Sequence, residues 1–384
     1  MSEHRTGIGA FLKGVAELFA PAKQETPAPA QEAYAAQPPE TAARLPFGSD
    51  YMEGAHPTVL SRLAETNMEH TSGYGTDAYC ESARQKIRAA VGCPDAAVHF
   101  LVGGTQTNAA VIDALLRPYQ GVLAPETGHI AVHETGAVEF CGHKVMTLPA
   151  KEGKITAAAI RGTCSAYWAS ETREHMVMPG MVYLSQPTEY GTLYTKAELT
   201  AIREACKTYH MALFVDGARL AYALACPEND VTLADLAKLC DVFYIGGTKC
   251  GAMFGEAVVI PDKKRLPYFT MTMKQHGALL AKGRLLGVQF DALFTNELYP
   301  NLGGPAIWAA GRLREKLTEK GYPLCVASPT NQVFTAIENG KVAALAERTG
   351  CESWEPYDEK RTVVRFVTSW ATTPEDVEAL IALL

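Results

Sequence analysis

Several features common in other protein classes are absent from this 384-residue sequence. It has no apolar run near the ~20 residues needed to span a bilayer, so no transmembrane helix is expected. Its formal net charge is −7 and it has no long basic block, which argues against a nucleic-acid-binding surface. Its ten cysteines are scattered and form no C-x-x-C pair, a pattern typical of reduced core thiols. These features favour a soluble cytoplasmic protein of ordinary globular composition.

The first 45 residues differ from the rest of the chain. Residues 8–20 carry apolar side chains at helical spacing, and residues 21–43 are rich in proline, alanine and glutamine. A short amphipathic helix on a flexible tether resembles the encapsulation peptides that dock enzymes into bacterial microcompartments. A partner-binding or merely frayed tail is the alternative.

From about residue 47 onward, segments typical of strands alternate with segments typical of helices. Thr76 or Asp77 can cap a helix over residues 76–92, and Thr195 and Glu198 can form a capping box. This alternation predicts a mainly parallel α/β sheet with helices on both faces. Residues 256–260 lie too close to the preceding strand for a crossover helix, so they should run antiparallel to it.

The pattern changes after about residue 305. A helix is followed by a strand at residues 333–337, a second helix, a strand at 362–370 and a last helix that starts near Thr373. We therefore expect three parts: residues 1–45 as helix and linker, 46–300 as a large domain, and 301–384 as a small α+β domain.

One lysine, Lys249, lies in a glycine-rich turn between two strand-like segments. Asp216 ends an earlier strand, and Gly104 and Thr105 lie in a Gly-Gly-Thr turn between a strand and a helix. Open α/β sheets bind ligands at the carboxyl ends of their strands, so all three features should meet at one edge. Pyridoxal 5′-phosphate needs these three groups: an amine for its aldehyde, an acid for its ring nitrogen and an anion nest for its phosphate.

Four segments, residues 101–108, 127–137, 214–224 and 244–252, together resemble the L-threonine aldolase and aromatic amino acid β-eliminating lyase family. The resemblance runs from about Ser49 to the C-terminus. It implies fold type I of the pyridoxal-phosphate enzymes. This fold has a mainly parallel sheet of the seven-stranded type, with helices on both faces, and a small C-terminal α+β domain. It also implies a homodimer or homotetramer.

The resemblance also implies roles for individual residues. Lys249 would form the Schiff base with the cofactor, Asp216 would pair with the ring nitrogen, and Gly104 and Thr105 would hold the phosphate. His129 would stack on the ring. Arg219 and Arg365 would bind the substrate carboxylate, Lys282 would reach the phosphate of a neighbouring subunit, and Tyr74 would lie near the site.

One segment departs from the family pattern. Threonine aldolases usually carry Asn-Thr-His after the strand that precedes residues 211–217, and this chain has Gln186, Pro187, Thr188 and Glu189 there. Either Glu189 replaces the histidine as a base, or His129 suffices alone, or the substrate differs. His129 and His133 are four residues apart, but nothing completes a metal site, so no metal is expected.

The leading hypothesis is a lyase, like the low-specificity L-threonine aldolases of EC 4.1.2, that converts L-threonine or L-allo-threonine to glycine and an aldehyde. The alternatives are a pyridoxal-phosphate-dependent β-eliminating lyase or aminotransferase, and a non-catalytic binding protein on the same fold.

Overall fold

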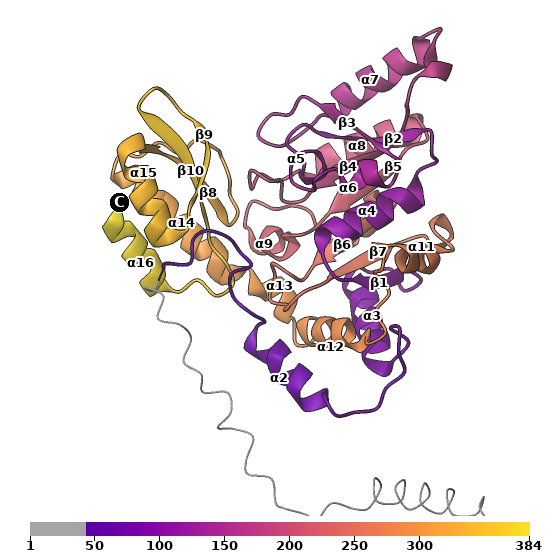
Figure 1. Cartoon of the computed structure of the whole chain (residues 1–384), viewed down its shortest axis with the longest axis horizontal. Helices are drawn as coiled ribbons and strands as arrows, with labels where there is room; N and C mark the ends of the chain where they lie inside the picture. The colour runs from indigo at the N-terminus through magenta and orange to yellow at the C-terminus, as the bar shows by residue number, and fades with distance from the viewer. Residues whose placement is uncertain (1–43) are drawn as a thin grey trace, which may run out of the picture. The chain divides into compact units, whose positions relative to one another are not determined.

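The computed structural model describes residues 44–384, and the expected N-terminal helix and linker therefore lie outside the described residues, apart from Arg44 and Leu45. A seven-stranded sheet forms the centre of the large domain (Figure 1). Its strands, in spatial order, are β1 (Ala97–Leu101), β7 (Glu256–Ile260), β6 (Val242–Gly246), β5 (Ala212–Asp216), β4 (Met178–Ser185), β2 (Gln120–Pro125) and β3 (Lys144–Leu148).

The strand directions confirm the predicted mainly parallel sheet. β3, β2, β4, β5 and β6 pair in parallel, whereas β7 is antiparallel to both β6 and β1. The expected antiparallel direction of residues 256–260 is therefore also confirmed. Only a short turn joins β6 to β7, and a turn of that length cannot make the long crossover that parallel pairing needs.

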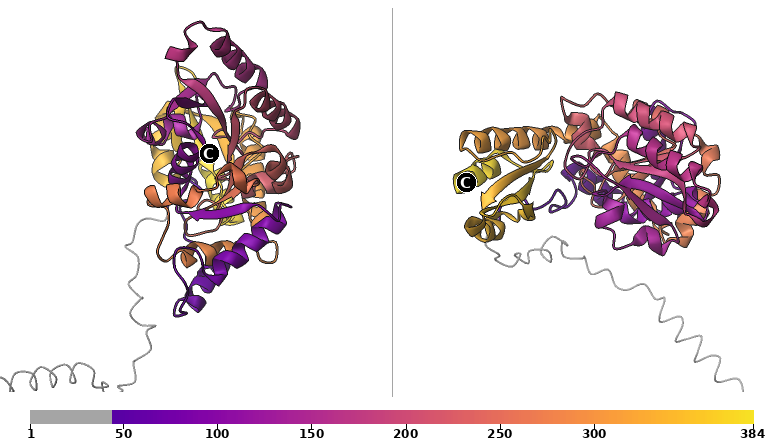
Figure 2. Two further views of the ribbon diagram at one scale, coloured as in Figure 1. Left: turned by 90° about the vertical axis from the view of Figure 1, so that its right-hand side faces the viewer. Right: turned by 90° about the horizontal axis from the view of Figure 1, so that it is seen from above.

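Helices cover both faces of the sheet (Figure 2). The core on one face includes residues of α2 (Pro57–Thr66), α3 (Ala78–Ala90), α7 (Ala157–Ala169), α8 (Lys196–Thr208), α9 (Leu220–Ala225), α10 (Leu233–Leu239), α12 (Arg284–Leu293) and α13 (Leu298–Leu302). The core on the other face includes residues of α4 (Gly104–Leu115), α5 (His129–Val132), α6 (Ala137–Phe140) and α11 (Phe269–Gln275). Two 3₁₀ helices, Arg173–His175 and Lys263–Arg265, lie in loops.

The C-terminal part forms a separate, smaller layer beside the large sheet (Figure 2). Its antiparallel sheet has the order β8 (Gln332–Glu338), β10 (Arg361–Val367), β9 (Glu352–Pro356), and its helices are α14 (Gly304–Glu319), α15 (Asn339–Thr349) and α16 (Pro374–Leu383). Phe47 belongs to this core, because its carbonyl accepts the amide of Val367 and its ring packs on Phe366. Phe47, expected in the large domain, therefore packs in the core of the small one.

The predicted helix starts are present. Asp77 caps α3, and Thr195 forms a capping box with Glu198. Thr373 forms another with Asp376. α4 ends at Leu115, and its C-cap Leu116 is already extended. Among the helices between residues 44 and 384, none is long and apolar enough to cross a membrane.

Candidate active site

A cavity of about 350 Å³ lies at the carboxyl ends of the parallel strands. Crossover connections bring these strand ends, and the loops after them, to the same edge of the sheet. Seven of the residues expected at the site line the cavity: Gly104, Thr105, His129, Glu189, Asp216, Arg219 and Lys249.

Lys249 lies in the turn between β6 and β7. Within residues 44–384 its amine forms no hydrogen bond or ion pair, and Nζ lies 5.9 Å from the ring centre of Tyr51. Burial lowers the pKa of Lys249, and the positive charge of Arg219 lowers it further. A lysine with a lowered pKa has more of the neutral amine, which is the nucleophilic form.

Asp216 is held at the end of β5 by four donors. Oδ1 accepts the Tyr244 hydroxyl at 2.5 Å and the Ala218 amide at 2.9 Å. Oδ2 accepts the Tyr183 hydroxyl at 2.6 Å and the Asn108 amide at 3.1 Å. Burial by itself would raise the pKa of Asp216, but nearby His129 and these hydrogen bonds lower it below its ordinary value. Asp216 is therefore a fixed negative charge at the cavity.

Tyr183 and Tyr244 were not identified from the sequence. They lie on β4 and β6, the two neighbours of β5, and all three side chains point to the face covered by α4. Burial and the charge of Asp216 raise the pKa of both tyrosines well above the usual value, so both hydroxyls remain donors. Side chains alternate between the two faces of a strand, so the sequence could place Tyr183 and Tyr244 on the face of Asp216 only after the strand order is known.

His129 is fixed by a buried carboxylate. Its Nδ1 lies 2.7 Å from Oε1 of Glu134, whose side chain is fully buried. The Asn108 amide donates to the same oxygen at 2.7 Å and also to Asp216. Asn108 on α4 therefore links the aspartate to the carboxylate that orients the histidine ring. Neither Asn108 nor Glu134 was expected from the sequence.

Glu189 contacts the backbone of His129, whereas Glu134 contacts its ring. Its Oε1 accepts the backbone amide of His129 at 2.9 Å and the Ser185 hydroxyl at 2.7 Å. Its Oε2 is buried without a hydrogen-bond partner in the described part of the chain. Burial raises the pKa of Glu189. This carboxyl group can therefore exchange a proton closer to neutral pH than an exposed glutamate.

The Gly-Gly-Thr turn forms the N-terminus of α4. The first amide groups of a helix have no partner within the helix, and together with the helix dipole they favour a bound anion. A Cβ on Gly104 would lie 3.2 Å from the Tyr244 hydroxyl, so the close approach of this turn to the sheet favours glycine.

A second buried acid, Glu256, lies in the cavity wall beside Lys249. Its oxygens accept the Thr248 hydroxyl at 2.8 Å and the Gly247 amide at 3.0 Å. Burial raises the pKa of Glu256 to about 8. Glu256 was not expected at the site, because the strand that starts there is otherwise apolar.

Arg219 forms an ion pair with Asp50, which was not expected at the site from the sequence. Its Nε and Nη2 donate to the two oxygens of Asp50 at 2.6 and 3.0 Å. Burial would lower the pKa of Arg219, but the Asp50 carboxylate raises it. Asp50 therefore already occupies the Nε–Nη2 edge of this guanidinium, the edge that binds a carboxylate through two hydrogen bonds.

Arg365 does not line the cavity. It lies on β10, where Nη1 donates to Gln332 at 3.0 Å and Nη2 to Glu352 at 2.5 Å. Burial lowers the pKa of Arg365, and so does the charge of Arg219. Arg365 is therefore not a lining residue, although the charges of Arg219 and Asp50 at the cavity still affect its pKa.

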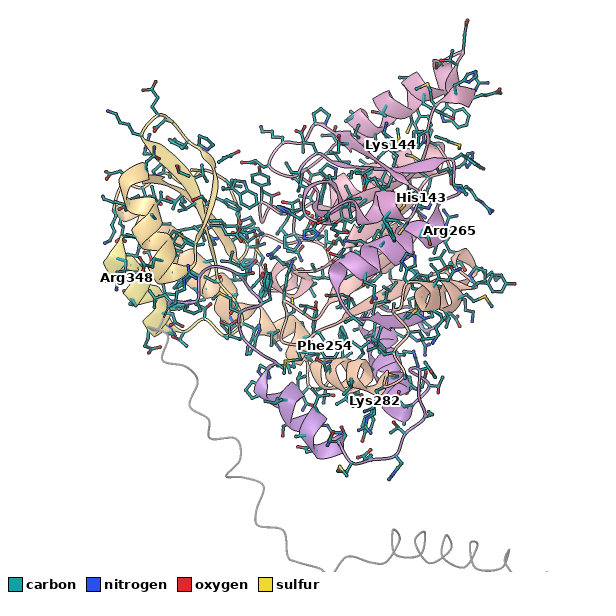
Figure 3. The ribbon with its side chains drawn as sticks, in the orientation of Figure 1. His143, Lys144, Phe254, Arg265, Lys282 and Arg348 are labelled. Atoms are coloured by element: carbon teal, nitrogen blue, oxygen red, sulfur yellow. The ribbon has the colours of Figure 1, made fainter. Side chains whose placement is uncertain are left out.

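Tyr74 and Lys282 lie elsewhere in this chain. Tyr74 is 51% exposed and lines a separate cavity of about 540 Å³ between α3, β1 and α11. Lys282 lies just before α12 (Figure 3). The two segments are adjacent, because the Tyr74 amide donates to the Ala281 carbonyl at 3.0 Å. The expectation that Tyr74 lies near Lys249 does not hold within one chain, because its segment packs against α12.

Comparison with known proteins identifies the family. The sequence pattern of the beta-eliminating lyases matches residues 47–352. The chain belongs to the beta-eliminating lyase family. The low specificity L-threonine aldolase of Pseudomonas aeruginosa is 31% identical over 344 residues, which cover 87% of this chain and 95% of that protein.

Solved structures agree with this family and with the fold. A threonine aldolase from Leishmania major is 43% identical, with a TM-score of 0.85, and the match covers 88% of this chain and 97% of that one. An aspartate aminotransferase from Thermus thermophilus, 16% identical with a TM-score of 0.65, shares the fold; the match covers 88% of this chain and 90% of that one. The predicted family, fold class and lyase class are confirmed.

Pyridoxal phosphate is the cofactor of this family, and the cavity fits it. Among residues 44–384, the cavity holds an amine without a hydrogen-bond partner at Lys249, a fixed negative charge at Asp216 and a helix N-terminus at Gly104. Its volume is within the range typical of cofactor sites. The cofactor expected from the sequence is therefore confirmed for the family, and the residues of this chain suit it.

Proposed function

We propose that this lyase breaks the Cα–Cβ bond of L-threonine, L-allo-threonine or a related β-hydroxy amino acid and releases glycine and an aldehyde. The supporting observation is that Glu189 and His129, joined by a 2.9 Å hydrogen bond, share one cavity with Lys249 and Asp216. That arrangement places proton-transfer groups beside the groups that suit the cofactor.

Bound pyridoxal phosphate supplies an aldehyde that reacts with amines and a ring that accepts the electron pair of the broken bond. Lys249 would supply the amine that holds this aldehyde. Asp216 would keep a proton on the ring nitrogen, and Gly104 and Thr105 would bind the phosphate. His129, whose ring is oriented by Glu134, would stack on the cofactor ring.

Glu189 is the base that we propose for the substrate hydroxyl. Its Oε1 is fixed by two donors, and its Oε2 is the oxygen left to accept a proton. Its pKa is raised by burial, which makes the carboxylate a stronger base than an exposed one. General-base assistance of this kind is typically worth ~10²–10⁴-fold in rate. Glu189 thus takes the place of the histidine found in the family pattern.

The substrate carboxylate needs a positive partner, and two arginines are available. Arg219 lines the cavity but is held by Asp50. Arg365 is held by Glu352, whose side chain is 48% exposed. We propose that Arg365 takes the carboxylate and that Arg219 supplies a fixed positive charge beside it.

We further propose a homodimer or homotetramer that acts in the cytoplasm, with Lys282 and Tyr74 reaching the site of a neighbouring subunit. The separation of both residues from the cavity of their own chain supports this proposal. The residues proposed to dock to a microcompartment shell or another partner lie outside the described residues. Deleting residues 1–45 should leave catalysis unchanged, and loss of activity would contradict this division.

The first experiment is a visible absorption spectrum of the purified protein, followed by addition of L-allo-threonine and an assay for acetaldehyde. A band near about 420 nm, together with acetaldehyde and glycine, is the expected result. Lys249→Ala is the control and should lack the band. A band with a keto acid and ammonia, or with amino-group transfer, would replace this function by β-elimination or transamination. If no band appears after pyridoxal phosphate is added, the alternative of a non-catalytic protein on the same fold would be favoured.

A further inference from the structure

The two arginines expected to bind a substrate carboxylate have very different partners. Asp50, on Arg219, is fully buried and makes two hydrogen bonds to the guanidinium and one to Asn331. Glu352, on Arg365, is half exposed and makes one hydrogen bond of 2.5 Å. Breaking a buried bidentate pair is costly, whereas an exposed pair contributes little. The partner of Arg365 is therefore the replaceable one.

The guanidinium of Arg365 is only partly satisfied. Gln332 accepts from Nη1 and Glu352 from Nη2, while Nε is buried with no hydrogen-bond partner among residues 44–384. A carboxylate that spans Nε and Nη2 makes two parallel bonds. Such a ligand would satisfy a donor that Glu352 leaves unpaired, so it has an intrinsic advantage over Glu352.

Arg365 also lies next to the wall of the active-site cavity. Gln332, its partner, donates through Nε2 to the Thr188 carbonyl at 3.4 Å. Tyr190 packs on Trp354 of the small sheet, with ring centres 5.5 Å apart. Thr188 and Tyr190 flank Glu189, which lines the cavity. The face of the small sheet that carries Arg365 therefore packs against the loop of the proposed base.

Glu352 lies in an edge strand with irregular pairing. β9 is the outer strand of its sheet, and Glu352 lies directly opposite Arg365 in the pairing with β10. The register shifts at Trp354, which lies 5.0 Å from the Arg365 guanidinium. An extra residue in an edge strand weakens the local ladder and directs side chains away from the regular pattern. Glu352 can therefore leave without breaking a regular sheet.

We propose that Glu352 occupies the carboxylate site of Arg365 in the free enzyme and is displaced by the α-carboxylate of the incoming amino acid. This inference rests on the proposed function only in taking Arg365 as the carboxylate partner. The released Glu352 side chain returns to solvent, where half of it already lies. Glu352 thus lowers the affinity for every amino acid and favours ligands whose carboxylate spans both nitrogens.

The test measures carboxylate binding separately from catalysis. Sodium propionate, which has a carboxylate but no amine, is titrated into the pyridoxal-phosphate-loaded enzyme by calorimetry. Glu352→Gln should bind propionate about two- to fivefold more tightly than the wild type, the range expected on losing an ion pair whose carboxylate is half exposed. Glu352→Asp, which is too short to reach Arg365 equally well, should also bind more tightly. Glu355→Gln is the matched control, because Glu355 is exposed on the same strand, pairs with Val363 and carries the same charge.

Steady-state kinetics with L-allo-threonine give a second readout. Glu352→Gln should lower KM by a similar factor and leave kcat within twofold, since only the binding competition changes. The proposal would be overturned if Glu352→Gln bound propionate no more tightly than the wild type. Equal increases in propionate affinity in Glu352→Gln and Glu355→Gln would also overturn it. If the wild type releases no acetaldehyde, the proposed function fails, but the propionate titration still decides the role of Glu352.

Discussion

Arg219 and Asp50 form a bidentate ion pair, with N–O distances of 2.6 and 3.0 Å, in which the carboxylate is fully buried. The pair joins the N-terminal segment to the start of α9, 169 residues further along the chain. Asn331, just before β8, donates to the same carboxylate at 2.9 Å. One buried aspartate therefore connects the cavity to the small sheet.

Replacement of Asp50 by asparagine should destabilise the protein strongly. Loss of the carboxylate leaves the buried guanidinium of Arg219 without a counter-charge, which typically costs about 3–5 kcal/mol. Urea unfolding of the apoprotein measures this change. Asp358→Asn removes an ion pair with Arg361 on the surface and is the control that should change little. Equal stability of the two variants would contradict the importance of the buried pair.

The stability of the apoprotein should fall as the pH rises toward 8, and Glu256 should cause part of this fall. Burial raises the pKa of Glu256 from 4.5 to about 8. Between these values the folded state keeps a proton that the unfolded chain has lost, so raising the pH favours unfolding by up to about 1.4 kcal/mol per pH unit. Glu256→Gln should flatten the dependence of the unfolding free energy on pH between 5 and 8. An unchanged slope would show that Glu256 ionises normally.

Replacement of Glu189 by glutamine should lower kcat by about 10²–10⁴-fold while KM changes little. Glutamine keeps an oxygen that can accept from the His129 amide and the Ser185 hydroxyl, but it cannot take up a proton. The measurement is acetaldehyde release from L-allo-threonine, with the cofactor absorbance as a check on the site. A loss smaller than about threefold would assign the base to another group.

Loss of the Tyr183 or Tyr244 hydroxyl should weaken cofactor binding. Each hydroxyl donates to Asp216, and these bonds help keep its pKa low. Leaving a buried acceptor with one donor fewer costs about 1–3 kcal/mol, which corresponds to about a 5–150-fold rise in Kd for pyridoxal phosphate.

Equilibrium dialysis of the phenylalanine variants measures the dissociation constant for pyridoxal phosphate. The control is Tyr209→Phe, whose hydroxyl lies on the surface and makes a bond of 3.4 Å to Arg161. A Kd like that of the wild type in both active-site variants would contradict a role of these hydroxyls in cofactor binding.

The sequence by itself determined the elements and the principal cofactor groups. Capping boxes such as Thr195–Glu198 depend on residues three apart, and such local interactions can be predicted without a fold. The positions of Lys249, Asp216 and Gly104 followed from their place at strand ends, because α/β connections bring those ends to one edge. These three residues do line one cavity.

The tertiary structure alone decided which side chains support these groups. Tyr183 and Tyr244 reach Asp216 because β4 and β6 flank β5, and no local pattern fixes strand order. Asp50 meets Arg219 across 169 residues, and Glu352 meets Arg365 through the register of an edge strand. Tyr74, expected near the site, lines another cavity of its own chain because its segment packs on α12. Contacts between distant segments depend on packing of the whole chain, and a single sequence read by local patterns does not contain that information.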